Sequence, residues 1–289
     1  YGREYIIPKP FDPRLITMVA PAVAKAAMDS GVATHPILDW NKYEEELLDR
    51  LGSDNKMVRL LTNRAKSDPK RVVFAEADHL DVLKAAQIVW EEGIGHPILL
   101  GDREVILELK AEIGFDADVP IYDPKTPEED KRRFHYADIF WKERRRKGIS
   151  LLDAQKWMRE RNYFAAMMVH EGEADALVTG YSRSYPSVVK PMLQLIGKAP
   201  GISIVASTNM MMTNRGPIFF SDTAINPNPT ADDIAKIAIM TANTVKLFGL
   251  EPVMAMVSFS NFGSLNHDSA VKLREAVAYL HKYYPDLIV

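Results

Sequence analysis

A strand-like run followed by hydroxyl and cationic side chains is the part of the sequence best suited to chemistry. The run ADALVTG ends at Gly180, and Ser182, Arg183 and Ser184 follow it before a predicted helix that contains Lys190. The free N–H groups of a helix N-terminus attract an anion, and hydroxyl and guanidinium groups add donors that suit phosphate. The pattern therefore predicts an anion site. The alternative is an N-cap serine beside a surface arginine.

Two further loops carry candidate ligand-binding side chains. Asn214 and Arg215 lie in MMMTNRGP between two predicted strands, where the alternative is an ordinary hairpin turn. The loop SFSNFGSLNHD contains Ser258 and Ser260. Because this loop is small and rich in hydrogen-bond donors, it suits a phosphate or a pantetheine arm.

A basic run, KERRRKG, occupies residues 142–148. Charge runs of this kind usually form a solvated helix face. The alternative is that Arg144 or a neighbour turns inward to a phosphorylated ligand.

Strands and helices alternate regularly from residue 71, a pattern that predicts a parallel sheet with helices on both faces. We expect strands over 71–77, 96–101, 118–123 and 174–180. Helices are expected over 79–93, 102–114 and 184–196, with a helical block over 127–172 in which Ser150 and Asp153 resemble a capping box. Further along, we expect strands over 202–212, 217–225 and 252–260, and helices over 230–249 and 268–284.

Residues 1–51 differ from the rest, because they offer two helical stretches, 19–33 and 39–52, and too little core to fold alone. They look like the last helix of a preceding domain followed by a linker helix. We therefore expect the chain to be a segment of a longer protein.

Composition excludes several classes of protein. The chain has no cysteine, so it forms no disulfide, Cys-ligated zinc site or iron–sulfur cluster. Its net charge of −3 argues against nucleic-acid binding, and its apolar runs fall short of the roughly 18 residues that span a membrane. The seven histidines are scattered, and no glycine-rich phosphate loop follows a strand. We expect no metal, no cofactor in these residues, no membrane partner and a cytoplasmic location.

Residues 71–289 resemble the phosphate acetyltransferase family throughout and in order. The matching blocks are RVVFAEADHLDVLKAA, KGISLLDAQKWMRERNYFAAMMVHEGEADALVTG, KPMLQLI, AINPNPTADDIAKIA and VSFSNFGSLNHDSAVKLREA. Residues 1–40, especially YIIPKPFDPRLI and VAPAVAKAAMDSGVA, resemble the end of the oxidoreductase domain of bacterial malic enzymes. The two parts in this order are typical of large NADP-dependent malic enzymes.

The resemblance implies two α/β/α, Rossmann-like domains with a mostly parallel sheet and a ligand cleft between them. The first would span residues 52–200 and the second, incomplete at its C-terminal end, 201–289, after a malic enzyme tail and linker over 1–51.

The resemblance also assigns candidate ligand-binding residues. Arg144 matches a substrate-binding arginine, and Ser184 matches a serine that the family places in a His-Ser-Thr sequence, here flanked by Arg183 and Tyr185. Lys190 replaces an arginine, so the charge stays but the bidentate fork is lost.

Ser258 and Ser260 match the family's Ser-x-Ser loop, although Asn261 and Phe262 differ from its usual residues. These departures would affect the acetyl-phosphate side of the cleft and leave acetyl-CoA binding possible. No catalytic residue is expected in this chain.

Three functions follow from the resemblance. The one we favour is an acetyl-CoA-binding regulatory and oligomerisation module of an NADP-dependent malic enzyme, which oxidises and decarboxylates malate to pyruvate and CO2. The malic enzyme domain of the same chain would then carry NADP and Mg²⁺ or Mn²⁺. The second is an active phosphate acetyltransferase that takes CoA and acyl-phosphate ligands. The third is a purely structural domain of a homo-oligomer.

Overall fold

The computed structural model describes residues 13–50, 53–213, 215–261 and 264–289. The chain divides into two compact units. The first comprises residues up to Ala22 together with Arg59–Gly197, and the second comprises Val23–Val58 together with Lys198–Val289. The predicted domain limits, 52–200 and 201–289, stay predictions.

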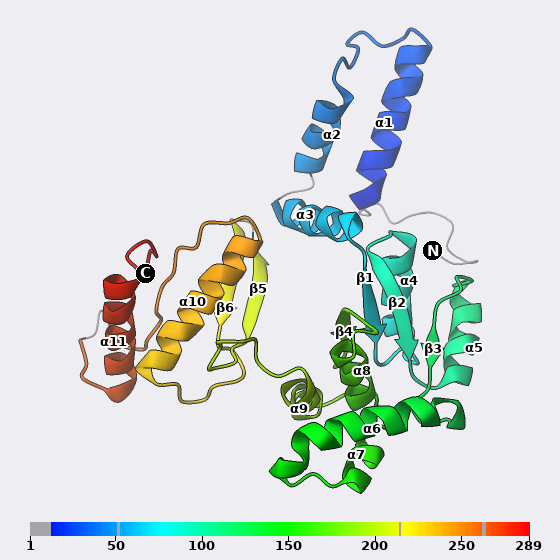
Figure 1. Cartoon of the computed structure of the whole chain (residues 1–289). Helices are drawn as coiled ribbons and strands as arrows, with labels where there is room; N and C mark the ends of the chain where they lie inside the picture. The colour runs from blue at the N-terminus through cyan, green and yellow to red at the C-terminus, as the bar shows by residue number, and fades with distance from the viewer. Residues whose placement is uncertain (1–12, 51–52, 214, 262–263) are drawn as a thin grey trace. The chain divides into compact units, whose positions relative to one another are not determined.

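The first unit is built on a four-stranded parallel sheet in the order β3-β2-β1-β4 (Figure 1). Its strands are β1 (Lys70–Phe74), β2 (Gly95–Leu100), β3 (Ile121–Tyr122) and β4 (Ala176–Val178). The central strand β1 pairs Val73 with Ile98 of β2 and with Leu177 of β4. The α/β class with a parallel sheet is therefore confirmed. Since all strands run the same way, the residues that follow β1 and β4 lie at the same edge of the sheet.

Helices cover both faces of this sheet, as the alternation predicts. Val73 and Leu100 face one cluster of buried residues with Tyr136, Phe140 and Phe164. The helices on that side are α6 (Asp130–Arg144), α7 (Leu151–Trp157), α8 (Arg161–His170) and α9 (Tyr185–Leu195). The predicted helical block over 127–172 also contains two short 3₁₀ turns, η1 (Pro127–Glu129) and η2 (Arg145–Lys147).

The other face of the sheet packs against α4 (Leu80–Glu91) and α5 (Arg103–Ile113). Phe74 and Leu99 point to this side, so neighbouring strand residues alternate between the two cores. The sheet is therefore buried on both faces, as parallel sheets generally are.

Local capping signals confirm two predicted helix starts. Ser150 and Asp153 form a reciprocal capping box at the start of α7, and Thr230 and Asp233 form another at the start of α10 (Ala231–Leu247). In each box the hydroxyl accepts the N3 backbone N–H while the carboxylate accepts the N-cap N–H.

The second unit pairs its strands differently. Strands β5 (Thr208–Thr213) and β6 (Gly216–Ser221) form an antiparallel hairpin, and α10 packs on α11 (Asp268–Tyr283) through Ala235, Ala238, Ala276 and Leu280. The strand expected over 217–225 ends earlier, because Asp222 adopts a positive φ of 55°.

The strand expected over 252–260 was wrong within the described residues, although its burial alternates residue by residue. Its only strand-like pairing is a single bridge between Val253 and Ile288. Alternating burial favours an extended backbone, but a strand also requires a partner along its length.

Among the described residues, three helices precede the sheet. They are α1 (Pro13–Asp29), α2 (Trp40–Asp49) and α3 (Ser53–Ser67). The first begins earlier than expected because proline is tolerated in the first turn of a helix. The third was not predicted, and the predicted stop at Gly52 lies outside the described residues.

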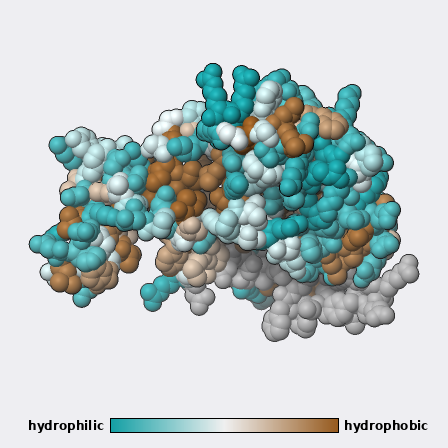
Figure 2. All heavy atoms as spheres, turned by 90° about the horizontal axis from the view of Figure 1, so that it is seen from below, coloured by the Kyte–Doolittle hydropathy of each residue, from teal (hydrophilic) through white to brown (hydrophobic). Residues whose placement is uncertain are grey.

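Within the described residues, none of the helices combines the length and the apolar character that crossing a membrane requires. The face seen in Figure 2 is mostly hydrophilic and carries separate hydrophobic patches. Exposed apolar side chains include Leu152 in the first unit and Val257 in the second.

Candidate functional site

The predicted anion site lies where β4 passes into α9. Gly180 adopts a φ of 103°, a conformation that side chains rarely allow, and the backbone turns there toward the helix. Ser184 is the N-cap of α9, yet its side chain makes no capping bond. The Ser187 hydroxyl instead donates to the Ser184 carbonyl oxygen at 2.7 Å. The loop thus has the predicted strand–glycine–serine–helix form.

The backbone donors of this loop converge on a carboxylate from the neighbouring strand. Glu76 follows β1, and its Oε1 accepts the N–H groups of Gly180 at 2.8 Å and Tyr181 at 2.9 Å. Its Oε2 accepts the N–H of Ser182 at 2.8 Å and the Ser182 hydroxyl. Only 1% of Glu76 is exposed. These donors therefore do bind an anion, but that anion is a carboxylate of the protein itself.

The pKa of Glu76 reflects two opposing effects. Burial alone raises it, since a buried carboxylate loses its hydration. The hydrogen bonds from Ser182, Gly180 and Tyr181 together outweigh burial and lower the pKa from 4.5 to about 2. Glu76 is therefore ionised at neutral pH.

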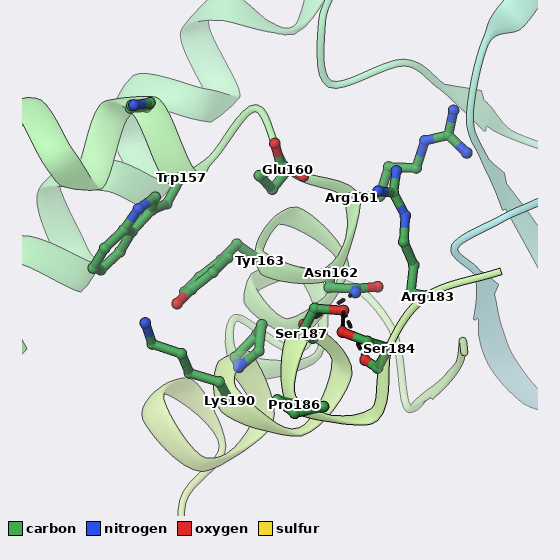
Figure 3. A pocket seen from close by; sticks show the side chains of 12 residues that line it. Trp157, Glu160, Arg161, Asn162, Tyr163, Arg183, Ser184, Pro186, Ser187 and Lys190 are labelled. Carbon is green, nitrogen blue, oxygen red and sulfur yellow. Dashed lines mark hydrogen bonds between the residues drawn. The ribbon is translucent and has the colours of Figure 1, made fainter. Parts of the chain in front are cut away.

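A cavity of about 560 Å³ opens beside this loop, between α8, α9 and the end of α7 (Figure 3). It is lined by Lys156, Trp157, Glu160, Arg161, Asn162, Tyr163, Arg183, Ser184, Pro186, Ser187, Lys190 and Pro191. The structure therefore brings together the predicted residues Arg183, Ser184 and Lys190. Ser182, which faces Glu76, is not among the lining residues.

The charge around the cavity is mainly positive. Lys156, Arg183 and Lys190 are exposed to solvent, and Glu160 is the one acidic side chain of the lining. Arg161 also lines the cavity, but its Nη1 donates to Asp78 Oδ1 at 2.6 Å and its Nη2 contacts the other carboxylate oxygen. Arg161 is thus already paired, and three cations face the solvent in the cavity.

An aromatic wall closes one side of the cavity. The rings of Trp157 and Tyr163 stack with centroids 5.3 Å apart and an interplanar angle of 21°. The Lys190 ammonium lies 5.2 Å from the centre of the Trp157 ring, and Figure 3 shows Lys190 on the Trp157 side with Arg183 on the opposite side. The Tyr163 hydroxyl donates to Gln194 Oε1 at 2.7 Å. This wall could carry a flat group of a ligand whose acidic part meets the cations.

Arg144, the candidate in the basic run, lies outside this lining. Its guanidinium donates to the carbonyl oxygens of Leu193, at 3.2 Å, and Gln194, near the end of α9. Cations are favoured there because the last carbonyls of a helix carry partial negative charge. Arg145 instead lies 5.7 Å from the centre of the Trp141 ring.

The remaining candidates lie in the second unit. Arg215 is exposed in the turn between β5 and β6, so the hairpin alternative describes its backbone, while Asn214 lies outside the described residues.

The Ser258 hydroxyl oxygen accepts the N–H of Ser260 at 3.2 Å, and the Ser260 hydroxyl oxygen accepts the N–H of Leu265 at 3.2 Å. Both serines stabilise their own loop. A cavity of about 840 Å³ in this unit includes Arg215 in a largely apolar lining.

Residues 56–289 match the family described as phosphate acetyl/butaryl transferase. The chain belongs to this family. One relative, a phosphate acetyltransferase from Thermoanaerobacterium thermosaccharolyticum, is 37% identical over 81% of this chain and 72% of its own length. The structure of a phosphotransacetylase from Streptococcus pyogenes superimposes with a TM-score of 0.70 at 35% identity, over 80% of this chain and 70% of that chain.

The chain is also similar to malic enzymes. An NADP-dependent malic enzyme from Salmonella typhimurium is 39% identical over 100% of this chain and 38% of its own length. The chain thus spans well under half of the malic enzymes that it matches. The predicted resemblance to both classes of protein is confirmed.

For this phosphate acetyl/butaryl transferase family member, sequence reasoning missed most of the cavity wall. Trp157, Tyr163 and Asn162 lie in a helical block where nothing in the sequence marks them as pocket residues. Glu76 did carry a signal: it is an acid within the apolar run RVVFAEA, just after a strand. Because parallel strands end at one edge, that position could have been placed next to Gly180. Within the described residues, no three His, Asp or Glu side chains gather as a metal site.

Proposed function

We propose that this chain is part of an NADP-dependent malic enzyme, in which it binds acetyl-CoA and regulates malate oxidation. The observation that carries the proposal is the extent of the similarity to malic enzymes. That similarity covers the whole chain, including residues 1–55, which precede the phosphate acetyl/butaryl transferase match. Similarity to phosphate acetyltransferases alone would not account for residues 1–55.

The chemistry of the cavity supports a CoA thioester as the ligand. CoA carries several phosphate groups and a purine ring, and the cavity combines solvent-facing Lys156, Arg183 and Lys190 with the Trp157 wall. Cationic side chains stabilise phosphate, and an aromatic face accepts a flat ring. Binding of this kind accelerates no reaction unless a second substrate is also held in line with the acetyl group.

Regulation requires that acetyl-CoA bind one state of the whole protein more tightly than another. Under this proposal the oxidation and decarboxylation of malate, with NADP and Mg²⁺ or Mn²⁺, belong to the other part of the longer protein. Self-association of the chain belongs to the same proposal, and sedimentation of the full-length protein with and without acetyl-CoA measures it.

The test is malate turnover by the full-length protein during titration with acetyl-CoA. We expect turnover to change with acetyl-CoA, and Arg183→Ala or Lys190→Ala to raise the acetyl-CoA concentration needed by about tenfold, since each removes a charge-assisted contact. Lys84→Ala, an exposed lysine of α4 outside the cavity lining, is the matched control and should leave the titration unchanged. Turnover that ignores acetyl-CoA would refute the proposal.

A second function is phosphate acetyltransferase activity, which the 37% identical phosphate acetyltransferase favours. It requires CoA and acetyl phosphate to be held together, with cations stabilising the phosphate. Formation of acetyl-CoA from these two substrates by the full-length protein measures it. A turnover abolished by Lys190→Ala and kept by Lys84→Ala would place this activity in the cavity.

A further inference from the structure

Glu76 and the loop after β4 form one closed unit at the edge of the sheet. The successive N–H groups of Gly180, Tyr181 and Ser182 all point at one carboxylate. Successive N–H groups in a turn of this kind form a concave anion site. Here Glu76, with only 1% of its surface exposed, accepts all three N–H groups, so these donors are already bound to a carboxylate of the protein.

Two side-chain hydrogen bonds also hold this loop in place. Thr179 donates its hydroxyl to Asn162 Oδ1 at 2.7 Å, and the Tyr181 hydroxyl donates to Asp81 Oδ2 at 2.5 Å. Asn162 lines the cavity, whereas Asp81 lies in the first turn of α4. The backbone between these anchors is therefore held from β1, α4 and α8 at once.

Two residues that line the cavity come directly after this hydrogen-bonded segment in the chain. Arg183 and Ser184, both lining residues, follow Ser182 in the chain. Their backbone positions are set on one side by α9 and on the other by the donors that Glu76 holds. We propose that Glu76 is a positioning residue of the cavity: it fixes the backbone at Gly180–Ser182 and so places Arg183 and Ser184 for an anionic ligand. This inference rests on the proposed acetyl-CoA site, but its first test requires no ligand.

The general contribution of a strand-linking carboxylate to stability must be separated from this role. The chain offers a control on the same two strands, a carboxylate that is hydrogen-bonded as Glu76 is, although it is exposed rather than buried. Asp175 precedes β4, and its Oδ2 accepts the backbone N–H of Arg71 at 2.8 Å while its carboxylate also pairs with the Arg71 guanidinium. Glu76 follows β1 and bonds the loop after β4, so the two carboxylates tie β1 to β4 at opposite ends of the strands.

The experiment compares Glu76→Gln with Asp175→Asn in the full-length protein. Each amide keeps the shape of its acid, but Glu76→Gln places an NH2 group against the Ser182 N–H or one of its neighbours. Hydrogen exchange without ligand is followed for peptides that contain Gly180–Ser182 and for peptides that contain Arg71. We expect at least tenfold faster exchange at Gly180–Ser182 in Glu76→Gln only, and faster exchange at Arg71 in Asp175→Asn only.

The second measurement is the affinity for acetyl-CoA. Glu76→Gln should weaken it at least tenfold, whereas Asp175→Asn should change it less than twofold. Gly180→Ala provides a variant that keeps Glu76 but disfavours the φ of 103°, and it should show the same selective losses if Glu76→Gln does not fold.

Each outcome decides the role of Glu76. Unchanged exchange at Gly180–Ser182 in Glu76→Gln would overturn it, as would equal loss of acetyl-CoA affinity in Glu76→Gln and Asp175→Asn. If the unmodified protein binds no acetyl-CoA, the proposed function fails, while the exchange measurement still decides whether Glu76 holds the loop.

Discussion

The loop before α9 and the helix itself contain two kinds of group that can bind an anion, and these groups have different surroundings. The backbone N–H groups at 180–182 serve the buried Glu76, whereas Arg183 and Lys190 remain open to solvent in the cavity. Under the proposed function, a phosphate-bearing ligand would meet these exposed side-chain cations rather than a backbone cradle. Lysine contributes a point charge without the bidentate geometry of arginine. Selectivity for one phosphate geometry at this cavity is expected to be modest.

The titration of Glu76 makes a prediction for stability in acid. Its pKa in the folded protein, about 2, lies below the ordinary value of 4.5, so its contribution is fully present above pH 4.5 and is lost as pH falls toward 2. Above pH 4.5 we expect Glu76→Gln to be less stable than the unmodified protein by about 3 kcal/mol. Urea unfolding at stepwise lower pH measures the difference, which should shrink toward pH 2. A difference that stays constant over this interval would contradict the assigned hydrogen bonds.

At the scale of an element, α9 contains a proline, and a side chain of the neighbouring helix α8 supplies the hydrogen bond that the proline removes. Pro191 lies inside the helix and has no N–H to donate to the Ser187 carbonyl, four residues earlier. Asn162, near the start of α8, donates its Nδ2 to that carbonyl at 3.3 Å. The side chain thus satisfies a backbone acceptor that the proline leaves open. This contact also ties the two helices that border the cavity.

A double-mutant cycle tests this compensation. Asn162→Ala should lower the free energy of unfolding by about 1–3 kcal/mol, because the Ser187 carbonyl and the Thr179 hydroxyl both lose their hydrogen bond to Asn162. In a Pro191→Ala background the helix regains its own N–H donor at this position. The cost of Asn162→Ala should then fall by about 1 kcal/mol, as measured by urea unfolding of the four proteins. Strictly additive effects would show that Asn162 does not serve the Ser187 carbonyl.

At the scale of the whole molecule, the chain passes between the two compact units at three points, and the last of them lies between Gly197 and Lys198. Residues 196–203 are exposed one after another, and they include Gly197 and Gly201, both with positive φ. Such a segment lacks the burial that protects helices and strands from proteases. The joint is therefore expected to be the weakest point of this part of the chain.

Limited trypsin digestion tests that expectation. Among the lysine and arginine residues between 70 and 289, we expect the bond after Lys198 to be cut first, because cleavage inside a helix requires local unfolding. Mass spectrometry of the early fragments identifies the site, and Lys198→Gln should delay the appearance of both halves. First cleavage within α6 or α10 would mean that those helices open more easily than the joint.

The order of the elements could be predicted from the sequence, because their signals are local. Hydrophobic periodicity predicted the strands of the parallel sheet, and the spacing of Ser150 and Asp153 predicted the capping box at the start of α7. Two exceptions were α3, which was not predicted, and the segment 252–260, whose alternation resembles a strand. A strand requires a pairing partner, which periodicity within the segment cannot specify.

The candidate site depended on contacts between residues far apart in the sequence. The loop at 180–184 and Lys190 could be recognised because their residue types and spacing suit an anion. Glu76 lies more than 100 positions before the donors that it holds, Arg161 is 83 positions from Asp78, and Arg144 is about 50 from the carbonyls that it contacts.

By itself, the sequence determined which groups were present and in what order along the backbone. Only the tertiary structure decided that Glu76 takes the backbone donors and that Arg183 and Lys190 line the cavity with their side chains exposed to solvent. The reason is physical. The pairing of β1 with β4 brings a carboxylate to those N–H groups, and donors that already bind a buried anion are not available to a second anion.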